Sequence, residues 1–193
     1  MGGRLYISRC TGRQGAGQRT AVEGENEPNM GEQQFIQYIE TLDRCGILGI
    51  EADDRAAADQ MHPLVLAYIG DSVYEIFIRT RLLNTFRTNV NRIHRASIDY
   101  VRAAAQADVA HSIIEGLSGK EADIVRRARN AKSGYVPKNA NVGEYRYATG
   151  FEALVGYLYI KQESERLLEI LQAAAARVER QIADKAAGVS GNG

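Results

Sequence analysis

Three carboxylates lie in unusually apolar segments of this 193-residue chain. Asp71 and Glu75 fall within LVLAYIGDSVYEIFI (64–78), where eleven of fifteen residues are apolar. Glu152 falls within YATGFEALVGYLYI (147–160), where ten of fourteen are apolar. Removing a carboxylate from water costs several kcal/mol unless it is paired or binds a metal ion. These acids are therefore the first candidates for chemistry.

A divalent cation shared between the two segments would offset the free-energy cost of burying these carboxylates. Carboxylate oxygens suit Mg²⁺, which keeps several waters and needs only one or two protein carboxylates. Gly70 and Gly156 would let the backbones approach closely beside Asp71 and Glu152. The alternatives stay open: these two acids could cap or hydrogen-bond within the fold, and Glu75 could instead pair with Arg79 four residues on.

A magnesium site bordered by basic stretches indicates phosphodiester chemistry, because the metal lowers the pKa of a bound water and stabilises charge on phosphoryl oxygens. The chain has zero net charge, with 24 basic and 24 acidic side chains, but the charges are not evenly spread. Residues 79–102 carry six basic and one acidic group, and 120–147 carry seven and three. Such clusters favour a polyanion, although they are also typical of solvated helix faces.

The second basic stretch supplies our candidates for contact with a nucleic-acid backbone. It places arginines on a predicted helix and lysines on the loop that follows, without the aromatic series of a single-strand binder. We therefore expect contacts to the backbone of a duplex. The candidate residues are Arg126, Arg127, Arg129, Asn130, Lys132, Ser133 and Lys138.

The elements that must position these residues are predicted to be helices, since no strand alternation persists and apolar spacing is helical. The fold class is all-α. Gly-rich and Pro-containing KSGYVPKNANVGE (132–144) is predicted to be a loop, and 51–59 a short acidic connection. The predicted helices cover about 32–45, 63–83, 89–117, 121–131, 146–160 and 163–186.

One domain is expected over 30–186, preceded by a disordered extension at 1–29 and followed by a disordered tail at 187–193. No apolar run reaches the eighteen residues of a membrane span, so no membrane association is expected. Cys10 and Cys45 lack metal-ligand spacing, which fits a reducing compartment, and we expect a cytoplasmic protein.

The two apolar segments also resemble a known family. LAYIGDSVYE (66–75) is similar to the signature helix of ribonuclease III nuclease domains, and FEALVGYLYI (151–160) to their second acidic helix. RRARNAKSGYVPKN (126–139) extends the resemblance to Mini-ribonuclease III, the short bacterial form, over about 32–185. Where longer relatives carry further acids, this chain has Leu64, Ala67 and Thr149, and this thinner carboxylate set resembles the Mini form.

The resemblance implies an all-α ribonuclease III fold, a homodimer, and Mg²⁺-dependent cleavage of double-stranded RNA that leaves 5′-phosphate ends. It implies that Asp71 and Glu152 are the catalytic, metal-binding pair and that the substrate is the 23S ribosomal RNA precursor. The 33 residues after 160 are too few for the double-stranded-RNA-binding domain of longer relatives, so a ribosomal protein on the RNA could assist substrate choice. The rival interpretation is a non-catalytic RNA-binding scaffold of the same fold, which the two retained acids disfavour.

Overall fold

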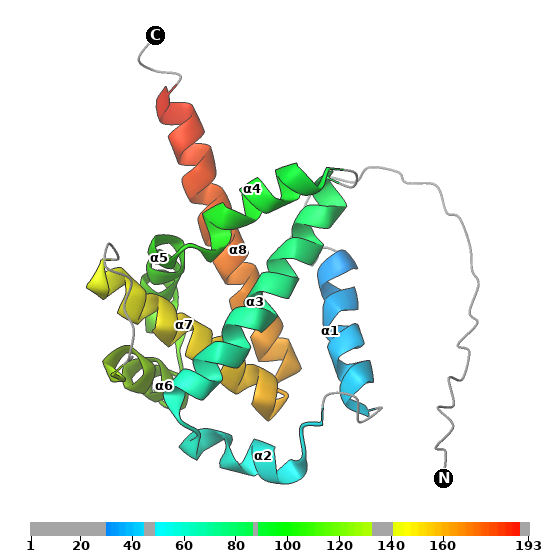
Figure 1. Ribbon diagram of the computed structural model, residues 1–193, viewed down its shortest axis with the longest axis vertical. Helices are drawn as coiled ribbons and strands as arrows, with labels where there is room; N and C mark the ends of the chain where they lie inside the picture. The colour runs from blue at the N-terminus through cyan, green and yellow to red at the C-terminus, as the bar shows by residue number, and fades with distance from the viewer. Residues whose placement is uncertain (1–29, 45–48, 87–88, 133–140, 190–193) are drawn as a thin grey trace, which may run out of the picture.

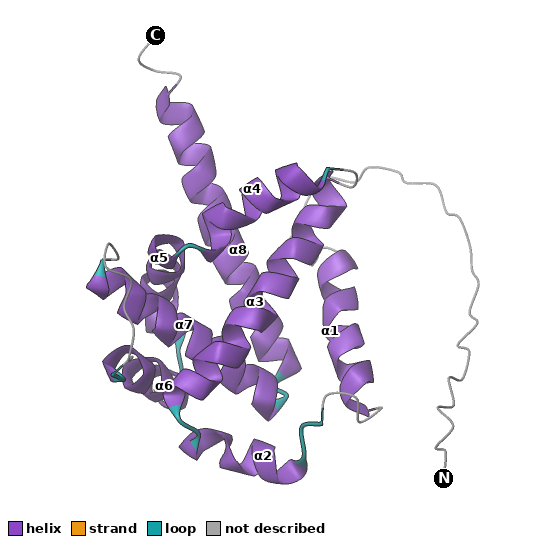
Figure 2. Cartoon of the chain, viewed as in Figure 1, coloured by secondary structure: helices purple, strands orange, loops and turns teal. Residues whose placement is uncertain are grey.

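The structure, a computed structural model, describes residues 30–44, 49–86, 89–132 and 141–189. Every regular element in these ranges is a helix, and the rest is loop or turn (Figure 2), which confirms the all-α prediction. The α-helices are α1 (Met30–Arg44), α2 (Ala52–Ala57), α3 (Pro63–Phe86), α4 (Val90–Val101), α5 (Ala103–Ile113), α6 (Gly119–Asn130), α7 (Val142–Lys161) and α8 (Ser164–Val189). Short 3₁₀ turns follow α2 at Ala58–Gln60 and α5 at Ile114–Gly116.

Helix α7 lies at the centre of the molecule, in contact with α3, α5, α6 and α8 (Figure 1). Eleven of its twenty residues are buried. A helix surrounded on several sides must be apolar on several faces, which explains why its sequence lacks a polar stripe. The same reasoning applies to α3, which packs against α1, α4 and α7.

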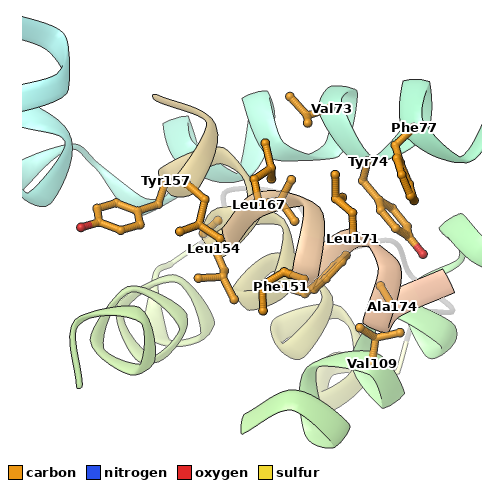
Figure 3. Close-up of a cluster of buried hydrophobic side chains, with 14 of the residues drawn as sticks. Val73, Tyr74, Phe77, Val109, Phe151, Leu154, Tyr157, Leu167, Leu171 and Ala174 are labelled. Atoms are coloured by element: carbon orange, nitrogen blue, oxygen red, sulfur yellow. The ribbon is translucent and has the colours of Figure 1, made fainter. Parts of the chain in front are cut away.

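The core forms where α3, α5, α7 and α8 meet (Figure 3). Tyr74 on α3 packs edge-on against Phe151 on α7, with ring centroids 5.0 Å apart. Leu171 on α8 and Val109 on α5 are fully buried beside them. This core fixes the mutual placement of the two helices that carry the acidic residues.

Two predicted segments differ from the structure, one in kind and one by a break within it. Residues 51–59 form helix α2 and a 3₁₀ turn, because Asp54 Oδ2 accepts the backbone N–H of Glu51 at 3.0 Å and caps the helix. The helical stretch predicted over about 89–117 is helical but divides at Arg102, whose extended backbone (φ −66°, ψ 145°) ends α4 and begins α5. Neither feature has an apolar periodicity that sequence reasoning could detect.

Helix α7 begins earlier than predicted, at Val142 rather than about 146. The side chain of Asn141 is the reason, since its Oδ1 accepts the backbone N–H groups of Gly143 and Glu144. The predicted loop therefore ends before 142, and its central residues 133–140 lie outside the described residues, as do 1–29 and 190–193. Helix α8 continues to Val189, three residues beyond its predicted end.

Candidate active site

The site is built on the crossing of α3 and α7, where two glycines bring the backbones together. A Cβ atom added at Gly70 would lie 1.8 Å from the carbonyl oxygen of Glu152, and one at Gly156 would lie 2.0 Å from that of Leu66. Neither position can hold a larger residue without separating the helices. The close approach expected from the two glycines is therefore present.

Asp71 and Glu152 are adjacent to this crossing, one on each helix, and both are partly buried. Asp71 follows Gly70 directly, and its negative charge is close enough to act on Glu152. Burial, followed by repulsion from Asp71, raises the pKa of Glu152 to about 7. Two carboxylates thus share one partly dehydrated site, and neither forms an ion pair with a cationic side chain in the part of the chain that the structure describes.

The pKa of Asp71 is also raised, first by burial and then by the charge of Glu75, while Arg79 opposes the shift. Glu75 itself is engaged by Arg79, with Oε2 and Nη2 2.6 Å apart in an i,i+4 ion pair. The pairing that competed with a metal role for Glu75 is therefore formed. Glu75 contributes negative charge to the site from a distance, while Asp71 and Glu152 form its centre.

Gln106 on α5 is a third member of the site that sequence reasoning missed. Its side chain is 1% exposed, and its amide lies near enough to the Glu152 carboxyl to lower the pKa of that group. Its Nε2 nevertheless has no well-formed hydrogen bond within the described residues. A lone Gln in the segment AAAQADVAHSI carries no signal of such a contact, because only the packing of α5 on α7 creates it.

The donor set fits a hard cation of the magnesium type. Asp71 and Glu152 offer carboxylate oxygens, and partly buried carboxylates with raised pKa values gain from binding a positive charge. Within the described residues, no group of three or more His, Cys, Asp or Glu side chains could hold a metal ion. A site with two carboxylates suits Mg²⁺, which keeps most of its waters, better than zinc or calcium.

The arginines of α6 differ in their exposure and in the groups that they contact. Arg126 is exposed and pairs with Asp123. Arg127 turns inward, where its Nη1 donates to the backbone oxygen of Asp59 at 3.0 Å. Asn130 and Lys132 are exposed at the end of the helix, whereas Ser133 and Lys138 lie outside the described residues.

Arg129 belongs to a cluster that the sequence did not reveal. Its Nη1 donates to the Tyr147 hydroxyl at 2.7 Å, and its guanidinium carbon lies 4.8 Å from the centre of that ring. The ring of His111 packs against the same tyrosine at 3.9 Å between centroids. His111 and Tyr147 border a groove of about 760 Å³ between α5, α7 and α8. The cluster joins the three consecutive helices α5, α6 and α7.

The first basic stretch, 79–102, is largely used within the fold. Arg81 pairs with Glu179 on α8 at 3.0 Å, and the Arg92 guanidinium lies over the Phe86 ring. Arg79 is held by Glu75. The charge of this stretch therefore serves contacts within the fold at least in part.

Comparison with known proteins agrees with this geometry. Residues 64–163, which include both acidic residues, match the Ribonuclease III domain. A Mini-ribonuclease 3 of Symbiobacterium thermophilum is 52% identical over 118 residues, which cover 61% of this chain and 91% of the relative. A Mini-ribonuclease 3 of a Thermoanaerobacter species is 44% identical over 145 residues, covering 75% and 94% respectively.

A crystal structure of a protein from Fusobacterium nucleatum has a similar fold. It is 28% identical, with a TM-score of 0.54 over 60% of this chain and 93% of that one. The fold of this chain is thus shared with a structurally characterised protein.

The chain belongs to the ribonuclease III family and is an endoribonuclease. Within the family its place is among the Mini-ribonuclease 3 proteins, as the resemblance of its two core helices predicted. The family acts on double-stranded RNA, generally depends on a divalent metal and typically forms dimers. None of the described helices is long and apolar enough to cross a membrane.

Proposed function

We propose that this endoribonuclease hydrolyses double-stranded RNA with Mg²⁺ as its cofactor and leaves 5′-phosphate and 3′-hydroxyl ends. Asp71 and Glu152 would be the catalytic, metal-binding residues. The observation that carries the proposal is the convergence of these two acids at the α3–α7 crossing, where burial and repulsion from a neighbouring carboxylate raise both pKa values, from Glu75 on Asp71 and from Asp71 on Glu152. A binding scaffold has no need to maintain such a cost.

The role of the protein is to present oxygen ligands in a fixed position beside the scissile phosphate. Gly70 and Gly156 fix the spacing of the helices, and the surrounding core prevents either acid from moving away. A bound Mg²⁺ would supply an activated water and neutralise charge on the phosphoryl oxygens. The contribution of Asp71 and Glu152 is then mainly electrostatic and positional.

The RNA backbone would be held by the end of α6 and the segment after it. Arg126, Asn130 and Lys132 are exposed there and can reach phosphates. We keep Ser133 and Lys138, which follow in sequence, in the same contact surface. Arg129 would act from its place against Tyr147, and Arg127, held by Asp59, would mainly anchor α6.

A homodimer is supported by an apolar stripe on the outer face of α3. Val65, Tyr68, Ile76 and Leu83 recur at helical spacing and are each about half or more exposed, with Tyr68 at 76%. Contiguous exposed apolar side chains mark an interface, and a second copy of the same stripe is self-complementary about a two-fold axis. Asp71 lies on α3 between this stripe and the buried face, so a dimer would bring two sites to one surface.

We further propose that the substrate is the 23S ribosomal RNA precursor, on the resemblance to Mini-ribonuclease III, with a ribosomal protein on the RNA assisting. The working unit would be residues 30–186 in the cytoplasm, with 1–29 and 187–193 as extensions. This part of the proposal concerns where the enzyme acts rather than its chemistry. It can be tested separately from the assignment of Asp71 and Glu152 as metal ligands.

Incubation of the purified protein with precursor 23S RNA, followed by mapping of the ends, tests the proposal. We expect Mg²⁺-dependent cuts in helical regions, with 5′-phosphates on the products, and no cleavage in EDTA. Cleavage that persists at full rate in EDTA would contradict the metal assignment. Cleavage of generic duplexes but not of the precursor would contradict the substrate alone.

A further inference from the structure

Gln106 is a buried amide with an unused donor in the described part of the chain. It lies on α5 among apolar neighbours such as Ala105, Val109 and Ala110, and its side chain is 1% exposed. Its Nε2 is shielded from water and has no hydrogen-bond partner there. Buried amides are nearly always satisfied, so an unsatisfied one calls for a functional or structural reason.

The amide is directed toward the second acid of the site. Interaction with Gln106 favours the ionised form of Glu152, which is the effect expected of an N–H donor beside a carboxylate. Gln106 Nε2 and the Glu152 carboxylate nevertheless do not meet the distance and angle of a formed hydrogen bond.

The packing of α5 on α7 holds this pair in place. Five residues along α5 from Gln106, His111 packs against Tyr147, which is five residues from Glu152 on α7. Both contacts, His111 with Tyr147 and Gln106 with Glu152, lie between α5 and α7, so the packing of these two helices holds Gln106 beside Glu152.

We propose that Gln106 is a positioning residue for the reaction, which donates its Nε2–H to one oxygen of Glu152 so that the other oxygen faces the cation. This inference rests on the proposed role of Glu152 as a metal ligand. Groups that hydrogen-bond a ligating side chain orient it, and their loss typically reduces metal affinity or activity about 10–100-fold. Gln106 touches neither RNA nor cation itself.

The test uses the full-length protein and Mn²⁺ as a spectroscopic probe. Gln106→Met keeps the length and unbranched shape of the side chain and removes the amide. We expect the dissociation constant for Mn²⁺, measured from the electron paramagnetic resonance of the free ion without RNA, to rise about 10–100-fold. In cleavage assays the Mg²⁺ concentration for half-maximal rate should rise in parallel, with RNA affinity unchanged.

Val109→Ala is the matched control, since it alters a fully buried residue one turn along α5 and removes no polar group. It should lower the melting temperature and leave the Mn²⁺ dissociation constant unchanged. If Gln106→Met does not fold, Gln106→Asn withdraws the amide by one methylene and should weaken Mn²⁺ binding in the same direction. A wild-type Mn²⁺ dissociation constant in the folded variant would overturn the inference.

Glu152→Gln separates this inference from the proposed function. If Glu152→Gln loses Mn²⁺ binding and cleavage while Gln106→Met behaves as the wild type, only the role of Gln106 is contradicted. If Glu152→Gln still binds Mn²⁺ and still cleaves RNA, Glu152 is not a metal ligand, and the inference about Gln106 fails with that assignment.

Discussion

The backbone of Gly70 lies directly against the carbonyl oxygen of Glu152, so close that a Cβ atom at position 70 would be 1.8 Å from that oxygen. This contact couples the two catalytic candidates, because Asp71 follows Gly70 and Glu152 is the residue contacted. The distance between the acids is therefore set by backbone packing rather than by flexible side chains. Changes at the crossing should affect chemistry and stability together.

Gly70→Ala should force α3 and α7 apart, and we expect a loss of at least about 1–3 kcal/mol in the free energy of unfolding, typical of overpacking. Cleavage should fall by more than the loss of folded protein explains. Urea unfolding and single-turnover cleavage measure the two effects. Gly119→Ala, which meets nothing within 4 Å, is the control and should be close to neutral. A fully active Gly70→Ala would show that the spacing is not critical.

Asp71→Asn should abolish cleavage while preserving the fold and the binding of RNA. The substitution keeps the shape of the side chain and removes a charge whose raised pKa shows that burial disfavours it. The melting temperature in EDTA should therefore be equal or higher than in the wild type. Cleavage, gel-shift and thermal unfolding assays give the three readouts. Normal turnover by this variant would defeat the catalytic assignment.

The stability of the protein in EDTA should depend on pH through Glu152. Its pKa rises from about 4.5 in the unfolded chain to about 7 in the fold, so the folded state binds more protons in this interval. The free energy of unfolding should fall as pH rises from about 4.5 to 7, by on the order of 2 kcal/mol from this residue, and level off above.

Urea unfolding at several pH values measures this dependence. Glu152→Gln should flatten the profile between pH 4.5 and 7, because the amide does not titrate. An unchanged slope in that variant would assign the dependence to other groups.

Neutralising Lys132 and Lys138 together should weaken RNA binding and make it less sensitive to salt. Each lost phosphate contact lowers the slope of log K against log salt by roughly 0.7–0.9. Binding to an uncleaved duplex, followed at several salt concentrations in Ca²⁺, gives the slope. Arg180→Gln, which changes an exposed cation on α8, is the control and should leave it unaltered. An unchanged slope in the double lysine variant would remove this segment from the contact surface.

Tyr68→Glu should disrupt the proposed dimer, because Tyr68 is 76% exposed and is the most exposed residue of the apolar stripe on α3. A charge there opposes its own copy across a two-fold axis. We expect a monomer in sedimentation equilibrium, with the helical content of the wild type by circular dichroism. Tyr38→Glu, on α1 and 56% exposed, is the matched control and should leave the assembly intact. A Tyr68→Glu dimer of wild-type affinity would place the interface elsewhere.

The sequence alone determined the all-helical class, the two core helices and the acids on them. It could do so because helices surrounded by protein must be apolar on every side, and a carboxylate or a glycine within them stands out. The Glu75–Arg79 pair was equally readable, since residues four apart on one helix are neighbours. These features depend on spacing within one element.

Tertiary structure decided whatever depends on contacts between elements. Gln106 reaches Glu152 only because α5 packs on α7, and Arg129 and His111 both contact Tyr147 only because three helices converge. The inward turn of Arg127 toward Asp59 and the break at Arg102 likewise have no periodic signature. The position of a single buried amide and the backbone angles of a single residue depend on neighbours in space. The order of residues within one segment does not specify those neighbours.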